Sequence, residues 1–187
     1  MRDPKGWIQT FTGVQFWPLD PRSEDVRIED IAHALSNICR FGGHSREFYS
    51  VAQHSVLVST YVPAEHRLVA LMHDAPEAYL GDMVRPMKHS RAMQGYRDAE
   101  DAVWAAVAET FGLPATIPEP VHVADHRLLY TERRDLIYPR DWPDAGWEKT
   151  AGAVAEPYGE VIVPWSPKHA ESIFLGHFYA ATGVSCL

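Results

Sequence analysis

Residues 68–77 read Leu-Val-Ala-Leu-Met-His-Asp-Ala-Pro-Glu, a segment that passes abruptly from uncharged apolar residues to ionisable ones. The five apolar residues predict a buried helix, which draws His73 and Asp74 toward the protein interior. A buried carboxylate is costly unless it is paired or bound to a metal ion. Glu77 follows Asp74 by three residues, so on a helix all three side chains would surround one point. The segment therefore predicts a helix that ends in a polar cluster suited to a metal ion.

Helical patterns extend over most of the chain on both sides of this segment. Further helices are expected over residues 28–38, 46–61, 90–111, 118–138 and 166–182. Residues 7–18 are rich in β-branched and aromatic residues around Thr12-Gly13, and they predict a short hairpin. Glu160-Val-Ile-Val163 predicts a strand that joins this hairpin in a small sheet. The expected fold class is mainly α with a small β element.

The composition is typical of one globular domain spanning residues 1–187. Apolar residues make up 46% of the chain and charged residues 22%, and the formal net charge is −8. This acidic balance argues against binding to a nucleic acid polymer. The two cysteines, Cys39 and Cys186, cannot form a disulfide framework, and no segment resembles a signal peptide or a membrane span. We expect a cytoplasmic protein that does not contact membranes.

One helix end cannot complete a metal site, so further ligands must come from other segments. His54 lies among small and apolar residues in Val-Ala-Gln-His-Ser, which favours an inward-facing position. Asp125 lies in His122-Val-Ala-Asp125-His126, where the two histidines are rival ligands. Taken singly, His54 and Asp125 are more often structural residues than ligands. The metal hypothesis gains weight because all of these positions fit one pattern.

That pattern resembles the HD-domain metal-dependent phosphohydrolases. The resemblance is carried by Arg40, by His54, by His73-Asp74-Ala-Pro-Glu-Ala-Tyr-Leu-Gly-Asp82 and by Ala124-Asp125. It is nearest to the bacterial 5′-deoxynucleotidases and the phage-type deoxynucleoside-triphosphate hydrolases. It covers about residues 40–125, just under half of the chain, and it implies an HD-domain helical bundle. The hairpin and the proline-rich residues 139–167 lie outside it.

The resemblance implies that four side chains hold one divalent metal ion: His54, His73, Asp74 and Asp125. Two imidazole nitrogens and two carboxylate oxygens suit a transition metal ion such as Mn²⁺, Co²⁺, Fe²⁺, Ni²⁺ or Zn²⁺ better than Mg²⁺ alone. An additional Mg²⁺ would accompany a polyphosphate substrate. We expect Glu77 to act as general acid or base, and Asp82 to share that role or to hold Glu77 in place.

A phosphorylated substrate needs positive charge in the site, and Arg40 is the best candidate because a guanidinium binds phosphate bidentately. Arg85 and Lys88 follow the metal-binding segment and would add a local basic cluster, although solvated surface charges explain them as well. Phe41 is a candidate for stacking on a base and equally for the core. His44, in the same loop, is a candidate for contact with substrate.

We expect a metal-dependent nucleotide phosphohydrolase that acts on a small-molecule substrate. The breadth of the family favours a nucleoside monophosphate, with a deoxynucleoside triphosphate as the alternative. A regulatory HD domain without activity is a second alternative, but it would have lost a ligand or Glu77. A metal-dependent nuclease or a cyclic-dinucleotide phosphodiesterase is a third alternative. The acidic net charge argues against polymer binding, and a two-metal phosphodiesterase would need further ligands such as His122 and His126. The amphipathic helices over residues 90–111 and 166–182 leave a homo-oligomer open.

Overall fold

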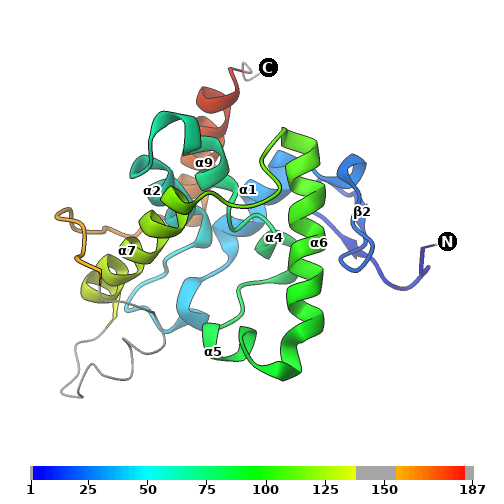
Figure 1. Ribbon diagram of the computed structural model, residues 1–187, viewed down its shortest axis with the longest axis horizontal. Helices are drawn as coiled ribbons and strands as arrows, with labels where there is room; N and C mark the ends of the chain where they lie inside the picture. The colour runs from blue at the N-terminus through cyan, green and yellow to red at the C-terminus, as the bar shows by residue number, and fades with distance from the viewer. Residues whose placement is uncertain (1, 138–154, 184–187) are drawn as a thin grey trace.

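The computed structural model describes residues 2–137 and 155–183. Its strands and helices are β1 (Ile8–Gln9), β2 (Gln15–Phe16), α1 (Ile28–Asn37), α2 (Val51–Thr60), α3 (Arg67–Met72), α4 (Glu77–Leu80), α5 (Arg85–Lys88), α6 (Gln94–Phe111), α7 (Glu119–Leu136) and α9 (Pro167–Thr182). The mainly helical fold with a small hairpin confirms the expected fold class (Figure 1). No helix in the two described ranges is both long enough and apolar enough to cross a membrane.

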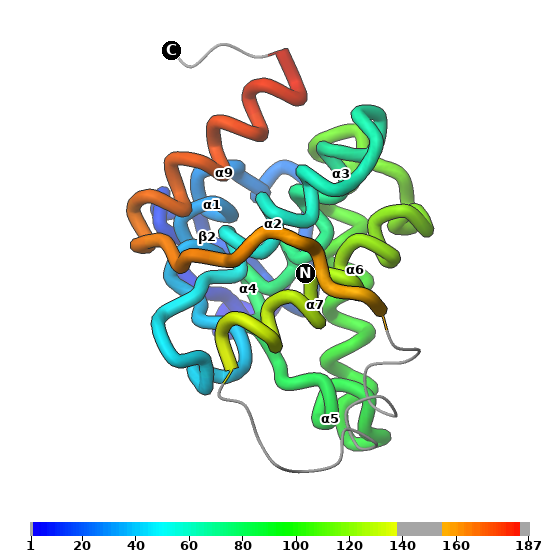
Figure 2. The backbone as a smooth tube through the Cα atoms, turned by 90° about the vertical axis from the view of Figure 1, so that its left-hand side faces the viewer, coloured from blue at the N-terminus to red at the C-terminus, as the bar shows by residue number. Residues whose placement is uncertain are grey.

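Helix α2 is the central element of this fold. It packs against α1, α3, α7 and α9, and only Leu57 and Thr60 of its ten residues are not buried. Figure 2 shows α2 surrounded by neighbouring elements. The helix begins later than the expected residue 46, because Ser50 caps it by accepting a hydrogen bond from the backbone N–H of Gln53 (3.1 Å). Any polar side chain that points inward from α2 is therefore held in the core.

The expected hairpin is present as the antiparallel pair β1–β2, in which Ile8 lies opposite Phe16. Phe16 is fully buried and stacks on Tyr79 at a ring-centroid distance of 3.8 Å. Buried Asp30 of α1 accepts hydrogen bonds from the backbone N–H and the hydroxyl of Thr12 in the hairpin turn (2.6 and 2.9 Å). Apolar packing and a buried carboxylate thus fix the hairpin to α1 and α4.

Residues 160–163 form no strand, which corrects the expectation that they extend the hairpin. Their backbone groups bond to side chains of two helices instead. The N–H of Ile162 donates to Asp135 Oδ2 (2.9 Å), and the C=O of Val163 accepts from Gln53 Nε2 (2.8 Å). Figure 1 places the hairpin and residues 155–166 on opposite sides of the molecule. The alternating valines resembled a strand, but side chains distant in the sequence satisfy this backbone.

Candidate metal centre

The His73-Asp74 pair lies in a turn between α3 and α4, and not on a continuous helix as the sequence suggested. Helix α3 ends at Met72, four residues before Pro76. A proline has no N–H to bond to the carbonyl four residues earlier, and its ring would collide with that carbonyl. The N–H of Ala75 bonds to the carbonyl of Met72 instead (2.9 Å). The tighter turn places both ionisable side chains against α2.

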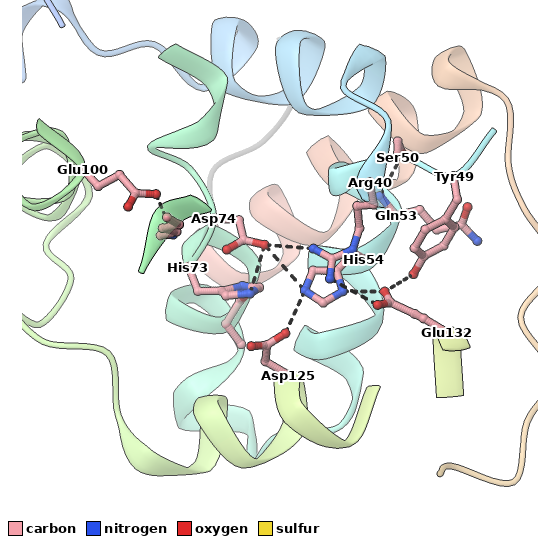
Figure 3. A network of polar contacts seen from close by, with 12 residues as sticks. Arg40, Tyr49, Ser50, Gln53, His54, His73, Asp74, Glu100, Asp125 and Glu132 are labelled. Atoms are coloured by element: carbon pink, nitrogen blue, oxygen red, sulfur yellow. Dashed lines mark hydrogen bonds and ion pairs between the residues drawn. The ribbon is translucent and has the colours of Figure 1, made fainter. Parts of the chain in front are cut away.

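The two imidazole rings face each other with one nitrogen of each already engaged (Figure 3). His54 is fully buried in α2, and its Nδ1 contacts Glu132 Oε1 at 2.6 Å. His73 Nδ1 lies 2.7 Å from the carbonyl oxygen of Ala70, to which it donates. The ring centroids are 5.3 Å apart. Both Nε2 atoms are buried and make no hydrogen bond, which is the arrangement expected of ligand nitrogens.

Two carboxylates approach these nitrogens from different elements. Asp74 Oδ2 lies 3.3 Å from His73 Nε2 and 3.5 Å from His54 Nε2. One ligand atom each from His54, His73 and Asp74 lies within 4.8 Å of the others, so this group can hold a metal ion. Asp125 of α7 is outside that three-residue group, but its Oδ1 lies 3.1 Å from His54 Nε2. The structure therefore brings all four predicted ligands together, three of them in the closest group.

The charge balance of the cluster favours a bound cation. Burial and Arg40 both act to lower the pKa of His54, but the carboxylates of Glu132 and Asp125 outweigh them and raise it to about 9. Burial acts to raise the pKa of Asp125, yet the imidazole of His54, 3.1 Å away, lowers it. The imidazole thus takes up a proton where carboxylates converge, and a metal ion would displace that proton. Two orphaned nitrogens and adjacent carboxylates fit the implied transition metal ion.

Glu132 is a central residue of the site that the sequence analysis missed. It is fully buried on α7, and besides His54 it accepts hydrogen bonds from Tyr49 Oη (2.8 Å) and Arg40 Nη2 (3.1 Å). Glu132 follows Asp125 by seven residues, which places both on one helix face. A carboxylate on the apolar face of a predicted helix was the signal available in the sequence.

A cavity of about 580 Å³ opens beside the cluster, and Asp74 and Asp125 form part of its wall. Glu77 and Asp82 also line it. Glu77 is only 7% exposed, and its buried Oε2 has no hydrogen-bond partner. Burial, followed by the charges of Asp74 and Asp82, raises the pKa of Glu77 well above its usual range. Both predicted acid–base residues therefore share one cavity with two of the predicted ligands.

Four of the five predicted substrate-binding residues line the same cavity: Arg40, Phe41, Arg85 and Lys88. Arg40 lies nearest the cluster, with Nη1 3.5 Å from Asp74 Oδ2. Lys88 is paired with Glu100 of α6 at 2.7 Å, whereas Arg85 is exposed. The fifth residue, His44, is exposed and does not line the cavity.

The rival ligands on α7 lie outside the cluster. His122 is exposed, and His126 packs its ring edge against Tyr130 at a centroid distance of 5.4 Å. Within residues 2–137 and 155–183, neither histidine belongs to the group that can hold a metal ion. Asp125 is outside that group as well, but its Oδ1 lies 3.1 Å from His54 Nε2, which favours Asp125 as the ligand from α7.

Comparison with known proteins places the chain among relatives that are named without a function. No family model matches the sequence. The chain is similar to the uncharacterized protein YfdR of Escherichia coli K12, with 44% identity over 174 residues that cover 92% of this chain and 93% of YfdR. It is also similar to the uncharacterized protein RCAP_rcc00048 of Rhodobacter capsulatus, with 40% identity over 126 residues that cover 63% of this chain and 64% of that protein. Because the similarity to YfdR extends over nearly the whole of both chains, this protein belongs to the same family as YfdR.

Proposed function

We propose that this protein is a divalent-metal-dependent phosphohydrolase of the HD-domain type that hydrolyses a nucleoside monophosphate to nucleoside and phosphate. The observation that carries the proposal is the placement of Asp74, Asp125, Glu77 and Arg40 around one cavity. Its volume of about 580 Å³ is within the range of small-molecule sites. Metal-binding, proton-transferring and phosphate-binding groups then lie within reach of one substrate.

The metal ion would be held by His54, His73, Asp74 and Asp125. When bound, it lowers the pKa of a coordinated water and offsets the negative charge of the phosphate. The mixed nitrogen and oxygen ligands favour Mn²⁺, Co²⁺, Fe²⁺, Ni²⁺ or Zn²⁺. In this proposal Glu77 exchanges the proton of the reaction, because its buried carboxyl has a free oxygen beside the cavity.

Arg40 is the proposed phosphate-binding residue. Its side chain is only 12% exposed, and the carboxylates of Glu132 and Asp74 raise its pKa despite burial, so it stays charged. Its guanidinium lies 5.5 Å from the ring centroid of Phe41, which also lines the cavity. Phe41 adopts a φ of +57°, a conformation rarely found in bulky residues. Such strain supports a functional position for this ring, which we propose stacks on the nucleotide.

The basic residues of the cavity favour a monophosphate over a triphosphate. Lys88 forms an ion pair with Glu100 (2.7 Å), and the carboxylate offsets the charge that a phosphate chain would otherwise meet. Arg85 lines the cavity but is exposed. Arg40 is thus the one cation of the described lining whose side chain is only 12% exposed and lies close to Asp74, which matches a single phosphate group.

A phosphate-release screen tests the proposal. Ribo- and deoxynucleoside mono-, di- and triphosphates are incubated with the protein and each of Mn²⁺, Co²⁺, Ni²⁺ and Zn²⁺, and the products are identified. We expect nucleoside and free phosphate from at least one monophosphate. Release of inorganic triphosphate from a deoxynucleoside triphosphate would favour the alternative substrate. No release from any nucleotide, with metal bound, would favour a regulatory domain.

Replacement of Arg40 by alanine should weaken substrate binding. A charged hydrogen bond of about 1.5–3 kcal/mol is removed, so we expect KM to rise about 10- to 100-fold. The measurement is steady-state kinetics on the nucleotide that the screen selects. Arg22→Ala serves as the control, because Arg22 is a surface residue near the hairpin. Unchanged KM and kcat in Arg40→Ala would exclude Arg40 from the site.

A further inference from the structure

We propose that Glu132 is a positioning residue that holds His54 in the tautomer needed for metal binding. The inference rests on the proposed function only in requiring a metal ion at His54. Figure 3 shows Glu132 on the side of the His54 ring opposite Asp74 and Asp125. It is too far back in the core to line the cavity with Arg40 and Glu77.

Three hydrogen-bond donors converge on this one carboxylate. Oε1 lies 2.6 Å from His54 Nδ1 and 2.8 Å from Tyr49 Oη, and Oε2 lies 3.1 Å from Arg40 Nη2. Both Glu132 and His54 are fully buried. A buried carboxylate is weak evidence for stability, because an apolar residue of similar volume often stabilises as well or better. The three contacts instead point to control of the groups that Glu132 touches.

The chemistry of these partners sets the proton on His54. An ionised carboxylate only accepts hydrogen bonds, so the ring atom that faces it must be a protonated Nδ1. The neutral ring then carries its lone pair on Nε2, which lies 3.5 Å from Asp74 and 3.1 Å from Asp125. Arg40 and Tyr49 bond to Glu132 and keep its oxygens in place. Glu132 thereby presents the correct nitrogen of His54 to the metal ion.

The Glu132→Gln variant separates this role from packing, because glutamine has nearly the same shape. One arrangement keeps a hydrogen bond to each of the three partners. The amide oxygen accepts from Arg40, which forms the stronger, charge-assisted bond, and the amide NH₂ donates to Tyr49 Oη and His54 Nδ1. In that arrangement Nδ1 of His54 is an acceptor, so its proton moves to Nε2. The variant is expected to fold, yet His54 no longer offers a lone pair to the metal.

Titration with Co²⁺ alone, followed by its visible absorption, measures the effect. We expect Glu132→Gln to bind Co²⁺ about 10- to 100-fold more weakly than the wild type, the range for groups that orient a metal ligand. The melting temperature without metal is expected to stay near that of the wild type. Tyr49→Phe removes one bond to Glu132 and leaves its carboxylate on His54, so its Co²⁺ affinity should stay within about threefold.

Thr131→Val is the matched structural control. Thr131 is the buried neighbour of Glu132, and its hydroxyl accepts from the backbone N–H of Tyr158 (2.9 Å) without touching the network. Co²⁺ affinity in Glu132→Gln within threefold of the wild type would overturn the inference. An equal loss in Thr131→Val would also overturn it, because the effect would then be general loosening of α7.

The result of the Co²⁺ titration does not depend on catalysis, because no nucleotide is present in that experiment. Failure of the phosphate-release screen with normal Co²⁺ results would count against the proposed function and leave the role of Glu132 intact. Should Glu132→Gln not fold, the tautomer is read in the Zn²⁺-loaded wild-type protein from its histidine ¹⁵N–¹H NMR spectrum. A proton on Nδ1 of His54 that is shifted downfield by a short hydrogen bond to Glu132 is the expected result, and an Nδ1 proton without that shift would overturn the inference.

Discussion

Metal binding is expected to be lost, together with all hydrolytic activity, when His73 or Asp74 is replaced by alanine. Both residues belong to the group of three whose ligand atoms lie within 4.8 Å of one another. Either single replacement leaves two members of that group together with Asp125. Replacing both leaves one nitrogen and one carboxylate, too few to hold a transition metal ion firmly. Metal content per chain after dialysis, and turnover of the selected nucleotide, measure the effect.

The control for this experiment is His122→Ala, because His122 is exposed on α7 outside the cluster. It is expected to retain metal and activity at wild-type levels. A His73→Ala/Asp74→Ala double variant that still held one metal ion per chain would place the metal site elsewhere. The melting temperature without metal should be recorded for each variant, since His73 bonds to the carbonyl of Ala70 and its loss affects the end of α3.

Much of this site could be predicted from the sequence because its ligands follow helical packing. Apolar neighbours identified His54 as inward-facing, and it is fully buried in α2. The choice of Asp125 over His126 needed the resemblance, because the two residues are adjacent in the sequence. The backbone predicted around His73 was wrong, because Pro76 enforces a turn there and the helix ends at Met72. The residue types indicated which side chains lie together even where the predicted backbone conformation was wrong.

The features that the sequence analysis missed depend on contacts between distant segments. Residues 160–163 alternate like a strand, but Gln53 and Asp135 bond to their backbone. No residue near Glu132 in the sequence indicates its contact with His54, which lies 78 residues earlier. His44 is next to a glycine pair in the loop of Arg40 and looked like part of the site, yet its side chain is exposed outside the cavity. The direction of a loop side chain and the pairing of distant residues can be read only from the folded structure.

Replacement of Glu77 by glutamine is expected to leave the metal bound while turnover falls by about 10²-fold or more, the usual contribution of a general acid or base. Glu77 lines the cavity but is not one of the three residues that can hold a metal ion, so the ligands should stay in place. Because glutamine keeps the shape and removes the exchangeable proton, a loss confined to kcat would identify proton transfer. Metal content and steady-state kinetics are both measured, with Glu100→Gln as a control for charge removal near Lys88.

The pH dependence of turnover provides a second test of the proton-transfer role of Glu77. Burial and the neighbouring carboxylates Asp74 and Asp82 raise the pKa of Glu77, which extends its protonated form to higher pH. If Glu77 donates a proton to the leaving oxygen, turnover falls as the pH rises through that pKa, and this alkaline limb should disappear in Glu77→Gln. Near-normal turnover in the variant would exclude Glu77 and move the role to Asp82, whose pKa burial also raises and which lines the same cavity. Asp82→Asn would then show the loss of turnover in its place.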